Sequence, residues 1–433
     1  MGEARQAATR AREAAPFLAA ATEEKRNEAL YAMASFVRQA TKAICAANAL
    51  DMQAAKKKGT SESILDRLML NADRVEAMAS ALEDLAALPD PTGKVLDQRD
   101  LYNGLHLTKL SVPIGVVAMV YEARPNVTAD AAGICVKSGN ASVLRGGSLA
   151  INSNLAIAHA LRAALASVGL PEDGVVAIES TDRAETDELL SLRGLVDILI
   201  PRGGAGLIQR CVEYAKVPVI ETGTGNCHVY VHETADLDMA RTIILNAKTR
   251  RFGVCNAAET LLVDSSIARA FLPEVMHELA AAGVSLHCDE EAYACASEEA
   301  NAAKNAGAVL QFDRATEEDW ETEYLAPELA IKCVSGVDEA IAHVNRFGTK
   351  HSEAIVANEQ TAEGAAAIES FLTQVDAAAV YANASTAFTD GGQFGLGAEI
   401  GISTQKLHAR GPFALEALTT YKYVVRGNGQ VRS

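Results

Sequence analysis

The chain has 433 residues, of which 49% are hydrophobic, and its formal net charge is −17 at pH 7. This length exceeds what one hydrophobic core usually supports, so we expect two or three domains. The negative charge argues against a nucleic-acid partner, because phosphate backbones are bound through clustered lysines and arginines.

The eight cysteines are scattered along the chain, without CxxC pairs or dense spacing. This pattern disfavours both a metal site and a disulfide framework, so we expect no metal ion and a reducing, cytoplasmic compartment. The segment Met1–Ala8 lacks the apolar core of a signal peptide. No apolar run approaches the roughly 18 residues that span a bilayer, so we expect a soluble protein without membrane association.

Residues 1–88 are rich in Ala, Leu, Glu and Lys, with apolar residues at helical spacing, as in Ala29–Met33. They predict a helical opening. The sequence Asp90–Gly93 breaks this pattern with a proline and a glycine. The alternation of leucines within Leu101–Ser111 then predicts a half-exposed strand or a hairpin.

From Pro113 onward, short apolar strands alternate with helices, which predicts parallel βαβ units. The expected strands are Gly115–Val120, Ser142–Leu144, Val175–Ile178, Val196–Ile200 and Val217–Ile220, and the expected helices are Val127–Lys137, Ala150–Val168 and Leu207–Ala215. In such folds ligands bind beyond the carboxyl ends of the strands, where glycine-rich turns approach phosphate. The turns here are 145–148, 202–206 and 221–225; none is a strict GxGxxG, so helix capping and phosphate binding both stay open.

A second alternating block begins near Asp236 and predicts a second α/β domain. Its expected strands are Leu261–Val263, Ala308–Gln311, Leu329–Cys333, Glu353–Val356 and Ala378–Tyr381. The tail carries Tyr421–Val425, a good strand with no helix to cover it. An uncovered strand invites pairing with Leu101–Ser111 or with another subunit.

The stretch Arg250–Val263 contains the most informative cysteine. Cys255 is flanked by small residues and preceded by a glycine and two arginines, and it lies in a turn that feeds the apolar run Thr260–Val263. Nearby positive charge lowers the pKa of a thiol from about 8.5, and only the thiolate is a good nucleophile. The alternative is a buried structural cysteine, but this context favours an accessible nucleophile on a rigid support.

Six motifs carry a resemblance to a known family. In chain order they are Tyr121–Thr128, Leu144–Ser148, Glu221–Val229, Gly253–Ala257, Gly348–Ile355 and Phe394–Gly401. With these motifs the chain resembles the aldehyde dehydrogenase superfamily over essentially its whole length, and within it the branch that reduces γ-glutamyl phosphate.

The resemblance implies an α/β fold of the aldehyde dehydrogenase type, with a Rossmann-like cofactor domain, an α/β catalytic domain and a small β oligomerisation element. The nucleotide-binding domain is expected to cover residues 1–99 and 114–226, and the catalytic domain residues 227–412. The oligomerisation strands are expected at 100–113 and 413–433.

The implied reaction is the reduction of γ-glutamyl phosphate by NADPH to glutamate 5-semialdehyde and phosphate, in proline biosynthesis. Cys255 falls on the nucleophile position, where a thioester forms and then accepts hydride. Asn126 matches the asparagine that completes the oxyanion hole with the backbone N–H of the cysteine. The alternative is that Asn126 caps a helix starting at Val127. Glu221 aligns with the general base of hydrolytic members, and here it is expected to be silent, structural or a proton shuttle.

The cofactor contacts are also implied by the resemblance. Arg145 matches the lysine that contacts the adenosine ribose, and Ser148 stands where NAD-preferring members carry a glutamate. This pair favours NADP, although a surface arginine beside a helix-capping serine is the alternative. Glu323 matches the acid that holds the nicotinamide ribose, although Leu325 and Ala326 depart from the family pattern. The glycines of the cofactor turns are Gly146, Gly147, Gly203 and Gly204.

Basic residues are candidates for binding the carboxylate and phosphate of the substrate. They are Arg124, Arg250, Arg251, Lys350, His351, His408 and Arg410, with Arg124 and Lys350 favoured. Asn383 and Ser385 are expected to border the same pocket.

Three rival functions remain open: a hydrolytic aldehyde dehydrogenase, a CoA-acylating relative, and a catalytically dead scaffold. Cys255 together with Asn126 argues against the scaffold. We expect a homo-oligomer, either a dimer or a tetramer, and a possible association with the glutamate kinase that supplies the acyl phosphate.

Overall fold

The computed structural model describes residues 2–302 and 310–432. The chain divides into two compact units. The first contains the residues up to Thr222, the segment Leu396–Gly401 and the residues from Phe413 onward. The second contains Gly223–Gly395 and Ile402–Pro412.

The first unit opens with five helices, as the apolar spacing predicted. They are α1 (Glu3–Ala20), α2 (Glu23–Gln39), α3 (Thr41–Lys57), α4 (Glu62–Leu68) and α5 (Ala72–Ala87). Side-chain caps begin two of them: Thr22 accepts a hydrogen bond from the backbone of Lys25 at 3.2 Å, and Asn71 accepts one from Arg74 at 2.9 Å. The break expected at Asp90–Gly93 is confirmed, since α5 ends before it.

The βαβ region of the first unit forms a parallel sheet of four strands in the order β5-β4-β3-β6. Its elements are β3 (Val116–Tyr121), α6 (Asn126–Lys137), β4 (Ala141–Gly146), η1 (Ser148–Ala150), α7 (Ile151–Ser167), η2 (Glu172–Gly174), β5 (Val175–Ala177), α8 (Arg183–Ser191), β6 (Ile198–Arg202) and α9 (Ala205–Tyr214). Every residue of β3 and β4 is buried, as expected for parallel strands covered on both faces.

One predicted strand of this region is wrong. The segment Val217–Ile220 forms only an isolated bridge, in which Val219 pairs with Leu199. Pro218 explains the failure, because a proline has no N–H to donate to a neighbouring strand. Its carbonyl still accepts a hydrogen bond from the backbone N–H of Leu199 at 2.9 Å.

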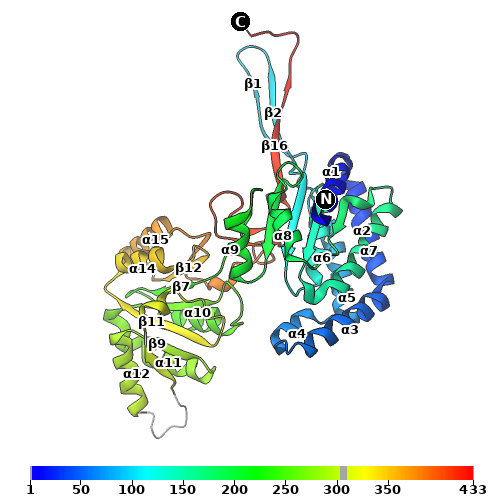
Figure 1. The fold of residues 1–433 in the computed structure, drawn as a ribbon. Coiled ribbons are helices and arrows are strands. Elements are labelled where there is room, and N and C mark those ends of the chain that lie inside the picture. The colour runs from blue at the N-terminus through cyan, green and yellow to red at the C-terminus, as the bar shows by residue number, and fades with distance from the viewer. Residues whose placement is uncertain (1, 303–309, 433) are drawn as a thin grey trace. The chain divides into compact units, whose positions relative to one another are not determined.

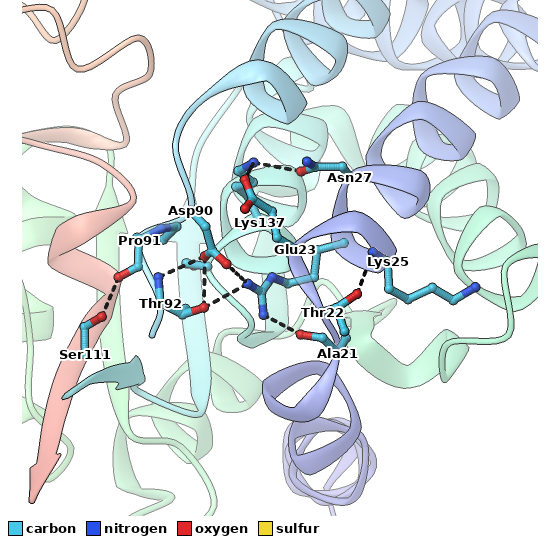
Figure 2. A network of polar contacts seen from close by, with 12 residues as sticks. Ala21, Thr22, Glu23, Lys25, Asn27, Asp90, Pro91, Thr92, Ser111 and Lys137 are labelled. Carbon is cyan, nitrogen blue, oxygen red and sulfur yellow. Dashed lines mark hydrogen bonds and ion pairs between the residues drawn. The ribbon is translucent and has the colours of Figure 1, made fainter. Parts of the chain in front are cut away.

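A buried polar network ties α2 to the loop that follows α5 (Figure 2). The guanidinium of Arg26, only 2% exposed, donates to the carbonyl of Ala21 at 2.7 Å and to Thr92 Oγ1 at 2.8 Å, and it pairs with Asp90. Nearby, the buried Nζ of Lys137 donates to Asn27 Oδ1 at 2.7 Å. The network therefore anchors the chain where it leaves the helices and enters β1.

Three antiparallel strands in the order β1-β2-β16 form a separate sheet that runs away from the helices of the first unit (Figure 1). They are β1 (Val95–Asp100), β2 (His106–Pro113) and β16 (Thr419–Arg426), the last preceded by η5 (Glu416–Leu418). The prediction for Leu101–Ser111 is confirmed in part: its second half lies in β2, whereas residues 101–105 form the hairpin turn and the partner strand β1 precedes the expected range. The pairing of the terminal strand is confirmed as well, since Tyr421 lies opposite Ser111.

The second unit is built on a parallel sheet in the order β10-β9-β11-β8-β7-β12-β13. The strands are β7 (Cys227–Val231), β8 (Ala258–Asp264), β9 (Ser285–Cys288), β10 (Phe312–Arg314), β11 (Glu328–Val334), β12 (Ser352–Val356) and β13 (Ala379–Ala382). The helices are α10 (Leu237–Thr249), α11 (Ser265–Ala281), α12 (Glu290–Ala302), α13 (Glu317–Glu321), α14 (Val337–Phe347) and α15 (Ala362–Gln374), with η4 (Thr386–Phe388) after β13. Half of the strand expected at Ala308–Gln311 lies outside the described residues; its last two residues are not in a strand, and β10 follows them directly.

Alternate strand residues of this sheet enter two different cores. Val229 and Val231 of β7 pack with α10, α11 and α12, whereas Tyr230 between them packs with α14 and α15 (Figure 1). This alternation explains why the strands appear in the sequence as continuous apolar runs. Two short strands, β14 (Gly401–Ser403) and β15 (Gly411–Phe413), pair where the chain passes between the units. Among the described helices, none is long and apolar enough to cross a membrane.

Candidate active site

Cys255 lies in the turn that leads into β8, at the amino end of the strand, as its sequence context predicted. The next residue, Asn256, fixes the turn from both sides. Its side-chain amide donates to the carbonyl of Thr389 at 3.0 Å, and its own carbonyl accepts from Thr386 Oγ1 at 2.8 Å. Cys255 itself is only partly buried. The thiol therefore sits on a rigid backbone and remains within reach of solvent.

A second loop, at the amino end of β7, packs directly on this turn. A Cβ atom added to Gly225 would lie 1.5 Å from the carbonyl oxygen of Cys255, so no larger residue fits there without movement. The thiol of Cys227 donates to the same carbonyl at 3.2 Å. The backbone N–H of Gly225 donates to Glu323 Oε1 at 2.6 Å. Gly225 therefore joins the turn of Cys255 to the loop of Glu323.

A fully buried ion pair lies behind the same loops. Lys248 of α10 bonds to Glu259 of β8, and both side chains have no exposed surface. Glu259 Oε1 also accepts from the backbone N–H of Leu325 at 3.3 Å, and Leu325 has a positive φ of 52°. Burial lowers the pKa of Lys248 and raises that of Glu259 to about 7. Burying two charged groups costs free energy. The pair connects β8, which follows Cys255, with the backbone of Leu325, which follows Glu323.

The register of the sheet places Lys350 and Cys255 at the same end of the sheet. Strand β7 lies between β8 and β12, with Cys227 paired to Ala258 and His228 paired to Glu353. Cys255 and Lys350 each precede their strand-paired residue by three positions, so both lie beyond the amino ends of their strands. Two strand spacings correspond to about 10 Å. The expected nucleophile and the favoured substrate lysine therefore lie at the same end of one sheet, the end formed by the amino ends of its strands.

Lys350 belongs to a cationic cluster that surrounds one carboxylate. Asp376 lies 2.7 Å from Arg410, 3.0 Å from Lys406 and 3.4 Å from Lys350. The hydrogen bonds from Arg410 and Lys406 lower the pKa of Asp376 to about 2, so it is ionised at neutral pH. Three cations on one carboxylate leave a local excess of positive charge in an acidic chain. Such a cluster can bind an anionic group.

Other expected substrate residues are placed differently. His351 is fully buried, and its Nδ1 lies 2.8 Å from Ser352 Oγ and 3.8 Å from Cys227 Sγ. Burial lowers the pKa of His351 to about 4, so its imidazole is neutral at pH 7 and cannot attract an anion by charge. In this structure the side chain of His351 contacts Ser352 and Cys227 and has no exposed surface.

Asn383 and Ser385 also serve the backbone. The side-chain oxygen of Asn383 accepts from the N–H of Ala357 at 3.0 Å, beyond the carboxyl end of β12 and opposite the end that carries Lys350. Ser385 is buried and caps η4 by accepting from the N–H of Ala387 at 3.2 Å. The residues that follow it hold Asn256, so Ser385 is linked to the nucleophile turn only indirectly.

In the first unit, Asn126 is the first residue of α6 and not its cap, so the helix-capping alternative is wrong. The N-cap position is occupied by Pro125, and no side chain caps this helix end. The amide of Asn126 is exposed and donates to Asp130 Oδ2, one helical turn later, at 2.9 Å. Arg124 is exposed on the loop before α6, and Glu221 is partly buried after β6.

The expected cofactor turns lie at the carboxyl ends of β4 and β6. A Cβ atom added to Gly204 would meet only Glu122 Oε2, at 3.9 Å, and one at Gly206 would meet no atom within 4 Å. The exposed Gly203 and Gly204 precede α9, and the N–H groups at a helix N-terminus are of the kind that bind phosphate. One of these, the N–H of Gly204, donates to the carboxylate of Glu122 at 3.0 Å. The turn thus already accommodates an anion.

The alternative to cofactor binding was that Arg145 is a surface arginine, but the structure shows it to be buried. It is 7% exposed and donates to the carbonyls of Gly146 at 2.6 Å, Thr181 at 3.1 Å and Asp182 at 3.2 Å. Its Nε is buried without a partner among the described residues. Ser148 is exposed and opens η1, where Gly147 and not Ser148 is the N-cap.

Several of these residues were missed by sequence reasoning. Asp376 carries no local signal, because its importance comes from neighbours distant in the chain. Gly225 stands in the expected glycine-rich turn 221–225, but its close contact with Cys255 could not be read from the sequence. Asp130 lies in the predicted helix Val127–Lys137, but Asn126 was placed before that helix; the structure starts the helix at Asn126, so the two side chains are four positions apart on one helix face.

The two-unit α/β architecture and the cysteine turn define an aldehyde dehydrogenase fold. The aldehyde dehydrogenase family model matches residues 2–321, and the chain belongs to this family. It is 53% identical to the γ-glutamyl phosphate reductase of Moorella thermoacetica, over 98% of this chain and 97% of the relative. It is 51% identical to the γ-glutamyl phosphate reductase of Thermobifida fusca, over 99% of each chain. The crystal structure of γ-glutamyl phosphate reductase from Thermotoga maritima is 46% identical and superposes over 100% of each chain with a TM-score of 0.94.

Proposed function

We propose that this protein reduces L-glutamyl 5-phosphate to L-glutamate 5-semialdehyde and phosphate, with NADPH as the reductant, in proline biosynthesis. The observation that carries the proposal is full-length identity of about half to relatives that are γ-glutamyl phosphate reductases. The Cys255 turn supports it, because it supplies the nucleophile that such a reaction needs.

In this mechanism the Cys255 thiolate attacks the acyl carbon, phosphate leaves, and a γ-glutamyl thioester remains. Bound NADPH would supply the hydride that reduces the thioester. The resulting thiohemiacetal collapses to the aldehyde and frees Cys255. Asn126 would donate a hydrogen bond to the oxyanion, a contribution of about 3 kcal/mol to lowering the barrier. The covalent intermediate replaces one difficult step by two easier ones.

The residues of the first unit fit a dinucleotide. The turn of Gly203 and Gly204 would hold the pyrophosphate at the N-terminus of α9, where Glu122 now supplies a carboxylate and lies, with Leu207, 2.8 Å from the position of a Cβ atom at Gly203. The turn after β4, including Arg145, Gly146, Gly147 and Ser148, would hold the adenosine ribose. Preference for NADPH is supported by the absence of an acid at position 148, since a glutamate there would repel the 2′-phosphate. In the second unit, Glu323 would hold the nicotinamide ribose.

The cationic cluster of Lys350, Lys406 and Arg410 would receive the anionic groups of the substrate, with Arg124 as a further candidate from the first unit. Its excess positive charge and its position at the Cys255 end of the sheet support this assignment. Water is not needed as a reactant, because hydrolysis would destroy the thioester. We therefore give Glu221 no role as a general base.

The test runs the reaction backwards in a buffer without phosphate, with glutamate semialdehyde and NADP, while inorganic phosphate is titrated in. NADPH formation should rise saturably with phosphate, because phosphate must release the acyl group from Cys255. Lys350→Ala should raise the KM for phosphate about tenfold, and more than the KM for the semialdehyde, since one cation of the cluster is lost. A full rate without phosphate, with glutamate accumulating, would show a hydrolytic dehydrogenase. A rate that depends on CoA instead would show an acylating one.

We further propose that the first unit binds the nucleotide, that the second carries the catalytic cysteine, and that the β1-β2-β16 sheet mediates self-association. A dimer or a tetramer is expected, since closed symmetric assemblies are the commonest. The scattered free cysteines support a cytoplasmic location. Association with the glutamate kinase would protect the labile acyl phosphate in transit.

A further inference from the structure

The side-chain amide of Asn126 has a partner that the reaction scheme does not use. Asp130 lies four positions later on α6, and its Oδ2 accepts from Asn126 Nδ2 at 2.9 Å. Residues at this spacing lie on one face of a helix, one turn apart. The contact is therefore built into the helix and needs no other element.

An ionised carboxylate can only accept hydrogen bonds, so it selects the NH₂ end of the amide and not its oxygen. An asparagine without such a neighbour can rotate and present either end to a ligand. With one N–H bonded to Asp130, the other N–H of Asn126 keeps a defined direction. An oxyanion donor has to point the same way before the reaction begins, because its value comes from preorganisation.

We propose that Asp130 is a positioning residue that locks the amide of Asn126 with a hydrogen outward for the oxyanion. The inference rests on the proposed function, in which Asn126 donates to the reacting oxygen. Among the described residues, the groups that act on the Asp130 carboxyl are Asn126 on its own helix and Arg202 at the end of β6. Arg202 favours the ionised carboxylate, which is the form the lock needs.

The protein holds this carboxylate at a cost in stability. Asp130 is partly buried, and burial raises its pKa from 3.8 to about 6, against the opposing effects of Asn126 and Arg202. A raised acid pKa means that the folded state is favoured while the group is protonated. This stability is fully present below pH 3.8 and is lost as the pH rises through about 6. At neutral pH an asparagine at this position should therefore give a larger free energy of unfolding than the ionised aspartate.

The proposal therefore predicts opposite effects of Asp130→Asn on activity and on stability. At pH 7.5 kcat should fall about ten- to a hundredfold, since an amide at position 130 can pair with either end of Asn126. The KM for NADPH should not change. The melting temperature at pH 7.5 should rise, and the difference from the unmodified protein should vanish near pH 4. If Asp130 had only a structural role, Asp130→Asn would raise the melting temperature without lowering kcat.

Three further measurements separate positioning from other roles. The unmodified protein should lose kcat below about pH 6 as Asp130 is protonated, and Asp130→Asn should lack that inflection. Asp130→Glu keeps a carboxylate within reach and should recover most of the lost kcat. In an Asn126→Ala background, Asp130→Asn should have no further effect on kcat, because its target is gone. Asp187→Asn, an exposed acid of α8 paired with Arg210, is the matched control and should leave activity and stability unchanged.

Retention of kcat within twofold in Asp130→Asn would overturn the proposal, as would equal losses in the presence and absence of Asn126. Failure of the proposed function is a different result, because then the unmodified protein itself would not convert glutamate semialdehyde with NADP and phosphate. Both outcomes are read in the same assay, so one cannot be mistaken for the other.

Discussion

At the scale of single residues, we expect the proposed activity of Cys255 to depend on the absence of a side chain at Gly225. Gly225→Ala would place a methyl group 1.5 Å from the Cys255 carbonyl oxygen, so the nucleophile turn has to move. We expect a loss of about 1 to 3 kcal/mol in the free energy of unfolding and at least a hundredfold loss of kcat/KM, because reacting groups tolerate little displacement. Urea unfolding and steady-state kinetics measure the two effects.

Two variants calibrate that result. Gly253→Ala is the stability control, since its nearest neighbour is the Leu325 carbonyl at an ordinary 3.8 Å. Cys255→Ala should fold normally and show no turnover, because a methyl group cannot form a thioester. Full stability of Gly225→Ala would mean that the turn has another position available. A tenth of normal activity in Cys255→Ala would exclude covalent catalysis there.

At the scale of elements, the polar network of α2 fixes the loop that leads from α5 into the β1-β2-β16 sheet (Figure 2). Arg26→Met should lower the free energy of unfolding by about 3 kcal/mol, because the partly buried carboxylate of Asp90 loses its counter-charge. Arg38→Met is the matched control on the same helix. Arg38 pairs with Glu76 and Glu83 near solvent, where ion pairs contribute little, so its loss should be clearly smaller. Equal losses from both variants in urea unfolding would contradict this account.

At the scale of the whole molecule, strand β16 presents one exposed apolar face. Tyr421, Tyr423 and Val425 alternate along it, and each is at least 50% exposed. A strand of this kind at a sheet edge favours association with another chain. Light scattering should therefore give a mass of at least twice the 45.6 kDa of one chain at micromolar concentration.

The double variant Tyr421→Glu and Tyr423→Glu should lower that mass to one chain, because charge on the apolar face opposes its burial. Thr420→Glu places a charge on the other face of the same strand and is the control. A one-chain mass for the unmodified protein would refute self-association through this sheet. An unchanged mass of the double variant would show that the interface lies on another surface of the protein.

The sequence alone determined those features that depend on near neighbours in the chain. Apolar spacing predicted the helical opening and most of the parallel strands, and small residues before β8 predicted the turn of Cys255. The uncovered strand at Tyr421–Val425 was expected to pair with Leu101–Ser111, and it does. Each of these follows from a period or a turn signal that spans a few residues, and Pro218 shows what happens when one residue breaks the pattern.

Only the tertiary structure decided which distant residues meet and which side chains are buried. The strand order β8-β7-β12 brings Lys350 to the end of the sheet that carries Cys255, and it encloses His351 so that the ring is neutral. Asp376 forms ion pairs with Lys350, Lys406 and Arg410, which come from separate segments of the chain. These contacts depend on strand order and burial, which arise from the packing of the whole sheet. No short stretch of sequence contains that information, because the same local pattern is compatible with several strand orders.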